Sequence, residues 1–336
     1  MMATLTHRRT LSDVVHDFDG RMVCLAISKD PNAKLTILLF PPGGDHPQYV
    51  AKVPTTSVAA AKVRHEAMVL ASLDRGRLDP ISGTIPEVEE VVEHMGWSVL
   101  VTTALPGRLM LASYHNWRHT ARPLSVREDF EAARLWLTQF QHASSIGATT
   151  LAAMIEGVTA ELSQRFGDDS FTGEDAQVLV TLHDRLDRQS IGRGLVHGDF
   201  WPGNLLVSDG KVSGAIDWEI SRPDGPLTRD LARFAIAYSL YLDRHTRSGR
   251  RVPGHAGLRA GAWGAGLEYA IKGSGWYPDV VRDFVAEGLQ RLGVDPSCAG
   301  DVILAEIACI AAEADDPEFA KNHLRLLRRL AWTEAQ

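Results

Sequence analysis

Cysteine is scarce in this chain of 336 residues, which contains only Cys24, Cys298 and Cys309. The three lie far apart and form no Cys-x-x-Cys pair, so neither a disulfide framework nor a zinc site is predicted. Positive charge is also limited, because 42 acidic residues outnumber 35 lysines and arginines and give a formal net charge of −7. Nucleic-acid binding favours the opposite balance, so no nucleic-acid partner is expected.

Long hydrophobic runs are equally scarce. The longest near the C-terminus, VILAEIACIAA at residues 302–312, is too short to cross a bilayer and contains Glu306. The N-terminus lacks the apolar core of a secretory signal. We therefore expect a cytoplasmic protein without a membrane span. The sequence also lacks a Walker A phosphate loop and a Gly-x-Ser-x-Gly elbow, which excludes two common catalytic motifs.

The first hundred residues have the pattern of strands with one helix. Apolar, β-branched runs at 21–27, 35–40 and 48–53 are separated by segments with turn residues, and they predict an antiparallel meander. Residues 55–73 follow with helical spacing, and the residues predicted to be buried are Ala59, Val63, Ala67, Leu70 and Leu73. Two further apolar runs, at 88–93 and 97–103, predict two more strands.

The pattern changes after the segment ALPG at residues 104–107. Residues 125–143 place Phe130, Ala133, Leu137 and Phe140 at helical spacing. From there the chain is predicted to be mostly helical, except at residues 195–217, where short apolar runs flank turns. A β-rich part of about a hundred residues therefore precedes a larger α-rich part, and ALPG is the candidate hinge.

Two charged residues of the first part stand where charge is costly. Lys52 lies inside a predicted strand, and Glu66 falls on the inward stripe of the predicted helix. An unpaired buried charge is expensive, so the simplest hypothesis is that Lys52 and Glu66 pair with each other. The alternative is that both are surface residues and that the predicted strand and helix are out of phase by one residue.

The stretch LVHGDFWPGNLLV at residues 195–207 brings three polar side chains together between apolar ends. They are His197, Asp199 and Asn204. A Pro-Gly pair excludes a regular helix, so these side chains are predicted to lie on a fixed loop before a strand. A second strand leads to Asp217, and a two-stranded ribbon would bring it back beside Asn204. Carboxylate and amide oxygens suit Mg²⁺, and Asp199 would be placed to receive a proton from a hydroxyl.

This arrangement resembles the catalytic loop of protein kinases, and in detail the aminoglycoside phosphotransferase and choline kinase family. The most specific part is His-Gly-Asp-x₄-Asn at 197–204, followed by Asp-Trp-Glu at 217–219. The resemblance covers nearly the whole chain. Its other matching positions are Lys52, Glu66, the hinge Leu-Pro-Gly at 105–107 and the helix that opens with Asp230.

The resemblance implies an α+β protein with a two-lobed, protein-kinase-like fold. A small antiparallel β-rich N-lobe at residues 1–105 would bind the nucleotide, and a larger, mostly α-helical C-lobe at 106–336 would carry catalysis and the acceptor. ATP, or GTP in its place, would lie in the cleft between the lobes. Lys52 would hold the α- and β-phosphates, with Glu66 orienting it. Backbone groups of the hinge would meet the base, at Thr103, Ala104 and Leu105.

The resemblance also implies roles for the loop residues. Asn204 and Asp217 would bind Mg²⁺, and Asp199 would orient the acceptor hydroxyl and take its proton. His197 would support the loop, and Asp230 would brace it or cap its own helix. The implied activity is ATP-dependent transfer of a phosphate to a hydroxyl of a small molecule.

One departure keeps an alternative function open. The segment at residues 27–34, ISKDPNAK, should lie over the phosphates but contains no glycine, so Ser28 and Asn32 are the candidate donors there. An inactive nucleotide-binding pseudokinase with a regulatory role is therefore the alternative. A protein kinase is disfavoured, because only about a dozen residues separate Asp217 from Asp230 and no Ala-Pro-Glu follows.

The acceptor itself is not determined by the sequence. Residues 224–336 contain 15 acidic and 14 basic residues, so composition gives no support for the acidic pocket that aminoglycosides require. A sugar, an amino alcohol or a natural-product hydroxyl fits as well. Trp276 and Tyr277 would either stack on a sugar or pack between helices. Packing is also expected for Trp201, and Glu219 is expected to be a surface carboxylate.

Overall fold

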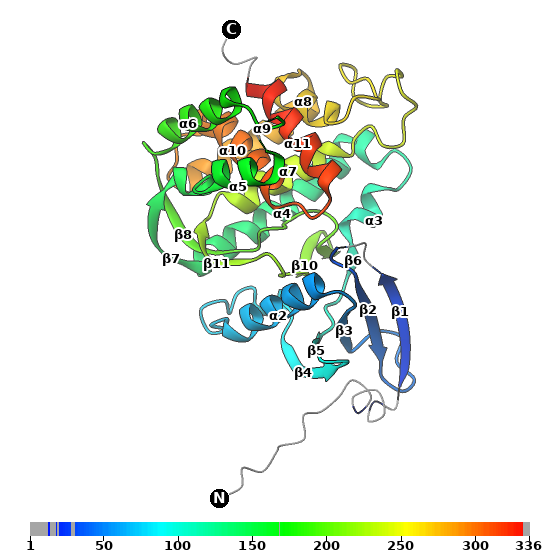
Figure 1. Ribbon diagram of the computed structural model, residues 1–336. Helices are drawn as coiled ribbons and strands as arrows, with labels where there is room; N and C mark the ends of the chain where they lie inside the picture. The colour runs from blue at the N-terminus through cyan, green and yellow to red at the C-terminus, as the bar shows by residue number, and fades with distance from the viewer. Residues whose placement is uncertain (1–12, 14–17, 19, 28–30, 168, 332–336) are drawn as a thin grey trace, which may run out of the picture. The chain divides into compact units, whose positions relative to one another are not determined.

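The structure is a computed structural model that describes Asp13, Phe18 and residues 20–27, 31–167 and 169–331. The chain folds into two compact units (Figure 1). The first consists of Met1–Pro106 and Gly214–Ser221, and the second of Gly107–Ser213 and Arg222–Gln336. Asp217 lies in the segment Gly214–Ser221 and therefore belongs to the same unit as Lys52.

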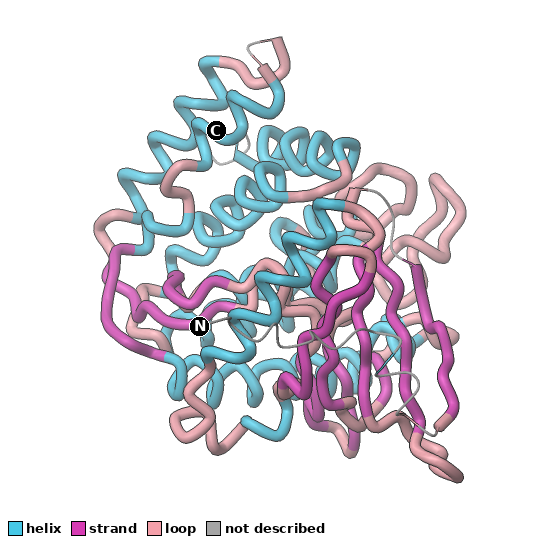
Figure 2. The backbone as a smooth tube through the Cα atoms, turned by 60° about the horizontal axis from the view of Figure 1, so that its bottom comes forward, coloured by secondary structure: helices cyan, strands magenta, loops and turns pink. Residues whose placement is uncertain are grey.

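The first unit is built on one antiparallel sheet with the strand order β1-β2-β3-β5-β4. Figure 2 shows these strands running side by side. Their bounds are Arg21–Ile27 for β1, Lys34–Phe40 for β2, Tyr49–Pro54 for β3, Val88–His94 for β4 and Trp97–Thr103 for β5. All five match strands expected from the sequence. In the central strand β3, Lys52 stands opposite Thr36 of β2 and Leu100 of β5.

The helix α2 (Ser57–Ser72) packs against this sheet. It begins at Thr56, whose hydroxyl accepts a hydrogen bond from the backbone N–H of Ala59 at 3.1 Å, as an N-cap residue does. Its buried face includes Val63, Leu70 and also Glu66. The sheet contributes a cluster of small β-branched and alanine side chains, which are Ala51, Val53, Val92, Val99 and Val101. A buried glutamate beside such apolar residues must find a charged partner.

The second unit is mostly helical, as the sequence predicts. Its helices are α3 (Met110–Tyr114), α4 (Pro123–Ser144), α5 (Val158–Phe166), α6 (Gly173–Leu186), α7 (Arg229–Leu240), α8 (Ala265–Lys272), α9 (Trp276–Arg291), α10 (Ala299–Glu313) and α11 (Pro317–Ala331). Short 3₁₀ turns lie between several of them. No helix within the described ranges is both long and apolar enough to cross a membrane.

Two small sheets accompany these helices. One has the order β10-β9-β6, with β10 at Lys211–Ala215, β9 at Leu205–Ser208 and β6 at Arg108–Leu109. The other has the order β11-β8-β7, with β11 at Arg222–Pro226, β8 at Ser190–Val196 and β7 at Ser145–Thr150. The ribbon of β9 and β10 was expected. The sequence does not predict β7 or β11, because β7 is largely exposed without an apolar pattern and β11 contains two prolines.

An aromatic cluster fills the core between α4, α7 and α9. Phe130 of α4 packs edge-to-face on Phe234 of α7 and Phe284 of α9, with ring centroids 5.2 and 5.1 Å apart. Close approach of α9 to α7 depends on Gly288, because a Cβ there would lie 2.5 Å from Leu231 Cδ2. The core fixes α7, and Asp230 in the first turn of α7 binds the loop at His197 and Gly198.

Candidate active site

The loop between β8 and β9 is tied to the start of α7. The Asp230 carboxylate accepts hydrogen bonds from the backbone N–H groups of His197 and Gly198, both at 2.8 Å. Burial raises the pKa of Asp230, although both N–H bonds act in the opposite direction. Gly198 has a φ of +82°, a conformation that side chains rarely adopt, so glycine is needed at the bend. The Asp230 carboxylate therefore fixes the bend of the loop, since both N–H donors belong to the loop itself.

A buried aromatic side chain anchors the same loop. Phe200 is fully buried and stacks on Trp136 of α4 with ring centroids 5.1 Å apart. The backbone N–H of Asp199 donates to Nδ1 of the buried His197 at 3.2 Å. In the neutral ring, this bond places the histidine proton on Nε2. Anchors on both sides of Asp199 therefore hold its backbone in place.

Asp199 and Asn204 are joined by hydrogen bonds. The Asn204 amide Nδ2 donates to the backbone oxygen of Asp199 at 3.0 Å and to its carboxylate Oδ2 at 2.9 Å. With the amide nitrogen turned toward Asp199, the carbonyl Oδ1 is the atom that Asn204 can offer to a cation. The predicted loop thus presents a fixed carboxylate and a fixed amide oxygen together.

The first unit contains the ion pair expected between Lys52 and Glu66. The Lys52 ammonium lies 2.7 Å from both carboxylate oxygens of Glu66, and Glu66 is only 1% exposed. The same ammonium lies 2.7 Å from Asp217 Oδ1. Burial disfavours the charged form of Lys52, but Asp217 and Glu66 outweigh burial and raise its pKa. The pairing hypothesis is confirmed, and the alternative of two surface residues is wrong.

Asp217 is held in an uncommon backbone conformation by its neighbour. Its φ is +69°, in the left-handed region that aspartate tolerates better than most residues. The buried Trp218 donates its backbone N–H to Glu66 Oε1 at 3.0 Å and its indole N–H to the backbone oxygen of Ala215 at 2.9 Å. Glu66 therefore orients Lys52 and also fixes the segment that carries Asp217.

The sequence prediction missed Lys34, which is the second lysine on Asp217. Its ammonium lies 3.0 Å from Asp217 Oδ1 and also contacts Glu219. Burial would raise the pKa of the Asp217 carboxyl, but Lys52 and Lys34 hold it well below its usual range. Register could have revealed Lys34, since it lies two residues before Thr36, the partner of Lys52, and so shares the same face of the sheet.

Glu219 corrects another expectation. Its side chain is only 10% exposed and is not a free surface carboxylate. It accepts a hydrogen bond from Asn32 Nδ2 at 2.6 Å, contacts Lys34, and lies 3.8 Å from the Lys62 ammonium. Asn32, a candidate phosphate donor in the sequence, is therefore directed at Glu219. Ser28, the other candidate, lies outside the described residues.

The hinge residues lie at the end of β5. The backbone N–H of Thr103 donates to the Glu87 carbonyl, and that of Ala104 donates to the Gln48 carbonyl, both at 2.9 Å. These two N–H groups already have partners within the unit. The N–H of Leu105 and the carbonyl groups of the segment are therefore the remaining candidates for contacts with a base.

The chemistry of the donors fits Mg²⁺. Asp217 is held as an anion, and Asn204 offers an amide oxygen, which are both ligands that a hard cation prefers. In the described part of the chain, no group of three or more His, Cys, Asp or Glu side chains is arranged to hold a metal. Mg²⁺ commonly uses one or two protein ligands and completes its shell with water and phosphate oxygens, so each of these oxygen donors is of the kind that this ion accepts.

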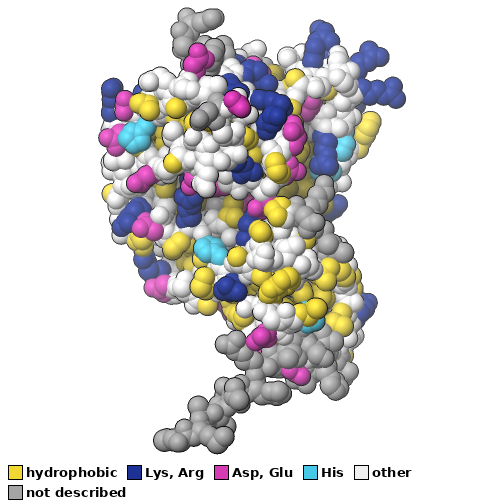
Figure 3. Space-filling model, in the orientation of Figure 1, with side chains coloured by type: hydrophobic (Ala, Val, Ile, Leu, Met, Phe, Trp, Pro, Cys, Tyr) yellow, Lys and Arg dark blue, Asp and Glu magenta, His cyan; other side chains and the backbone are white. Residues whose placement is uncertain are grey.

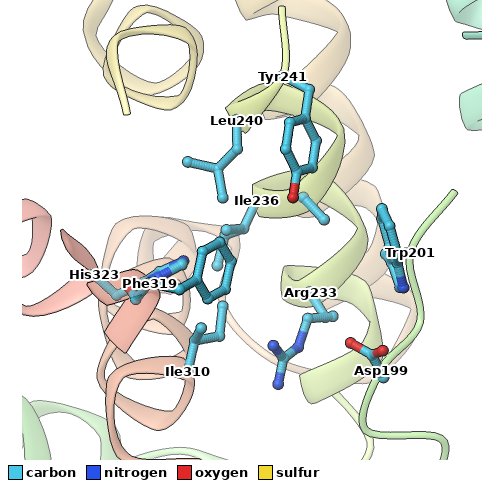
Figure 4. A pocket seen from close by; sticks show the side chains of 10 residues that line it. Asp199, Trp201, Arg233, Ile236, Leu240, Tyr241, Ile310, Phe319 and His323 are labelled. Atoms are coloured by element: carbon cyan, nitrogen blue, oxygen red, sulfur yellow. Dashed lines mark hydrogen bonds between the residues drawn. The ribbon is translucent and has the colours of Figure 1, made fainter. Parts of the chain in front are cut away.

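A cavity of about 220 Å³ opens beside Asp199 in the second unit. Figure 4 shows its lining side chains, which come from the loop, from α7 and from the last two helices. They are Asp199, Trp201, Arg233, Ile236, Ala237, Leu240, Tyr241, Ile310, Phe319 and His323. Trp201, expected only to pack, thus lines a cavity. Tyr277 is fully buried and packs between helices, which was the alternative to stacking on a sugar.

Comparison with known proteins identifies the family. The profile of the phosphotransferase enzyme family, APH, matches residues 42–263, about two thirds of the chain. The chain belongs to this family, and the prediction that it is a phosphotransferase is confirmed. A search of curated protein sequences found no significant match.

Solved structures of aminoglycoside phosphotransferases share the fold. A thermostable mutant of APH(4)-Ia in its apo form is 15% identical, with a TM-score of 0.55, and the match covers 96% of this chain and 98% of that one. The streptomycin–ATP complex of APH(2'')-IIa is also 15% identical, with a TM-score of 0.53 and coverage of 98% and 97%. ADP-bound APH(2'')-Ib, again 15% identical, has a TM-score of 0.52 and coverage of 95% and 96%. The predicted two-lobed, kinase-like α+β fold is therefore confirmed.

Proposed function

We propose that this protein transfers the γ-phosphate of ATP to a hydroxyl group of a small molecule with the help of Mg²⁺. The observation that carries the proposal is the meeting of Lys52, Glu66 and Asp217 in the first unit, where one ammonium is 2.7 Å from both carboxylates. A lysine oriented by a helix glutamate beside a metal-binding aspartate is the arrangement that kinase-like phosphoryl transfer uses. The ATP and ADP complexes of two related folds support a nucleotide as the donor.

Each unit would contribute its own residues to the reaction. In the first, Lys52 would hold the α- and β-phosphates in the orientation that Glu66 sets, and backbone groups of 103–105 would meet the adenine base. Asn204 and Asp217 would hold Mg²⁺, which supplies positive charge to the phosphate oxygens. In the second unit, Asp199 would accept the hydroxyl proton while the acceptor oxygen bonds to the γ-phosphorus. The bond from that phosphorus to the bridging oxygen breaks, and ADP leaves. His197 and Asp230 would keep the loop in place.

We further propose that residues 1–105 form the nucleotide-binding lobe and 106–336 the catalytic and acceptor-binding lobe. The acceptor would be a small molecule rather than a protein. The short segment after Asp217 supports this, because residues 222–226 form strand β11 of a sheet and α7 begins at Arg229. A protein kinase uses a long segment at this point to hold its substrate.

A thermal-shift titration tests the nucleotide site. ATP and GTP are each added with and without Mg²⁺, and a ligand at a hundredfold excess over its Kd stabilises the folded protein by about 2.7 kcal/mol. We expect a Mg²⁺-dependent shift in the wild type that Asp217→Asn loses, since asparagine keeps the size and tolerates the left-handed backbone. Asp209→Asn is the matched control, because Asp209 is exposed and also has a positive φ, of 51°. An equal Mg²⁺-dependent shift in both variants would refute the role of Asp217.

Lys34 gives a second prediction. Lys34→Met removes one of the two ammonium groups at Asp217 while keeping an unbranched side chain, and we expect the Kd for ATP to rise about tenfold, the loss of one charged hydrogen bond of about 1.5 kcal/mol. Lys62→Met is the control, because the Lys62 ammonium lies 3.8 Å from Glu219, whereas the Lys34 ammonium lies 3.0 Å from Asp217. Isothermal titration with ATP and Mg²⁺ measures both. Equal affinities for ATP in the two variants would show that Lys34 only neutralises Asp217 and Glu219 and does not contribute to nucleotide binding.

A further inference from the structure

The cavity beside Asp199 is mostly apolar and large enough for one ring. An engineered cavity of about 150 Å³ holds benzene, so about 220 Å³ accommodates a single ring of sugar or cyclohexane size. Two aromatic side chains, Trp201 and Tyr241, lie along one side with ring centroids 6.2 Å apart (Figure 4). The remaining apolar wall consists of Ile236, Ala237, Leu240, Ile310 and Phe319. Such walls favour the apolar face of a ring.

Polar groups in the cavity lining are few and do not suit a cation. Asp199 is the one carboxylate among the lining residues, and the proposed reaction already uses it. Arg233 contributes a guanidinium that carboxylates outside the lining hold in place, with Nε 2.9 Å from Oε1 of Glu306 and an Nη 3.9 Å from Oε2 of Glu313. An amine group in the cavity would therefore meet a fixed guanidinium and find no second carboxylate in the lining.

The histidine among the lining residues is neutral. His323 Nδ1 donates to the backbone oxygen of Phe319 at 2.9 Å, which makes Nε2 the unprotonated nitrogen. Nε2 is buried and has no hydrogen-bond partner among the residues that the structure describes. Burial lowers the pKa of His323 to about 3, so the ring stays neutral. Because His323 is fully buried and Nε2 is closed to solvent, the ring offers no acceptor to the cavity, and being neutral it brings no charge to the lining.

The segment that follows these lining residues is strongly basic. Directly after Leu240 and Tyr241, residues 242–259 carry one acidic residue, Asp243, and five exposed arginines, which are Arg244, Arg247, Arg250, Arg251 and Arg259. In Figure 3, dark blue Lys and Arg side chains gather at the upper right, where Figure 1 shows the yellow loop after α7. A surface of one sign repels ligands of that sign during encounter.

We infer that the acceptor is an alcohol without positive charge, whose ring lies on the apolar wall at Trp201 and Leu240, and not a polycationic aminoglycoside. The identity of the cavity as the acceptor site rests on the proposed function, because Asp199 is assigned there as the group that receives the proton. The inference adds the chemical class of the substrate. Three features support it, namely the apolar wall, the guanidinium of Arg233 in a lining with no carboxylate besides Asp199, and the exposed arginines of residues 242–259.

A matched pair of acceptors tests this inference. Phenyl β-D-glucoside and phenyl 2-amino-2-deoxy-β-D-glucoside differ by one ammonium group, and streptomycin and gentamicin serve as polycationic probes. ADP release with ATP and Mg²⁺ gives kcat/KM for each. We expect the neutral glycoside to exceed the amine on the order of a hundredfold, because like charges brought together cost several kcal/mol. The polycations should give no turnover above background.

Results against the acceptor inference differ from results against the proposed function. Equal or better use of the amine or of either polycation would overturn the inference, as would no use of the neutral glycoside by a protein that binds Mg²⁺ and ATP. Absence of any nucleotide-dependent thermal shift would instead count against the proposed function. The two failures are therefore distinguishable.

Substitution of one lining residue tests whether discrimination between the neutral glycoside and the amine arises in the cavity. Leu240→Glu places a carboxylate on the wall, and Leu240→Gln is the control of the same size without charge. We expect the ratio of kcat/KM for the amine to that for the neutral glycoside to be at least tenfold higher in Leu240→Glu than in Leu240→Gln. Equal ratios in the two variants would show that the acceptor does not lie against Leu240.

Discussion

Replacing Asp199 with asparagine should lower kcat for phosphate transfer by about 10³-fold, since a positioned general base contributes between about 10² and 10⁴. Asparagine preserves the shape of the side chain, and its amide oxygen can still accept the hydrogen bond that Asn204 Nδ2 gives to Asp199 Oδ2 at 2.9 Å. The loop should therefore stay in place, because Asp230 and Phe200 hold it independently of residue 199. What is lost is the group that accepts the hydroxyl proton.

The readouts separate loss of the base from loss of structure. ADP release under saturating acceptor gives kcat, and a thermal-shift titration gives the affinity for ATP with Mg²⁺. We expect kcat to fall while the nucleotide affinity changes less than about twofold, a free-energy difference below 0.5 kcal/mol. Asp199→Ala should lose kcat to the same extent. Unchanged kcat in either variant would refute the assignment of Asp199, and with it the proposed mechanism.

The second large effect concerns stability, at a buried ion network between α7 and α10. Arg229 is 1% exposed, with its Nε 3.1 Å from Glu306 Oε2 and an Nη 2.8 Å from Glu313 Oε2. Arg233 shares Glu306, at 2.9 Å. Arg229→Met should reduce the free energy of unfolding by about 3–5 kcal/mol, because it leaves a fully buried glutamate with one partner fewer.

Urea denaturation followed by far-UV circular dichroism measures this loss. The control is Arg134→Met, the same change in the exposed pair between Arg134 and Glu131 on α4, where we expect less than about 1 kcal/mol. Comparable losses in the two variants would mean that the Arg229 network contributes no more than a surface pair.

The network also predicts a dependence on pH. Burial would raise the pKa of Glu313, but Arg229, Arg233 and Arg222 together lower it below its usual range. Its stabilising contribution is thus fully present above the unfolded pKa of about 4.3 and is lost as the pH falls through the lower folded pKa. The stability difference between wild type and Arg229→Met should therefore narrow on acidification. A difference that widens in acid would contradict this assignment.

Local features of the site could be predicted from the sequence. Lys52 and Glu66 were recognisable because each places a charge on a stripe that is otherwise apolar, and the structure pairs them at 2.7 Å. The loop at 197–204 was recognisable because its Pro-Gly pair and polar residues are consecutive. In both cases the signal lies within a few residues of the chain, where spacing and local conformation are linked.

Features that depend on segments far apart in the chain could not be predicted from the sequence. Lys34 is 183 positions from Asp217, and its role appears only when strand register places it on the same face as Lys52. The cavity draws its lining from residues between 199 and 323. Strands β7 and β11 pair with β8 although neither has an apolar alternation, because backbone hydrogen bonds and not side-chain pattern hold them.

The left-handed backbone conformation at Asp217 restricts which amino acids can replace aspartate at this position during evolution. Glycine, asparagine and aspartate adopt a φ of +69° more readily than most residues, so most mutations at this position would strain the chain. Asparagine is one base change away and keeps both size and conformation, but it carries no charge. Even this substitution takes a carboxylate away from the buried ammonium groups of Lys34 and Lys52, so it would lower stability as well as metal binding. In a population, loss of function through this position would therefore also reduce the amount of folded protein.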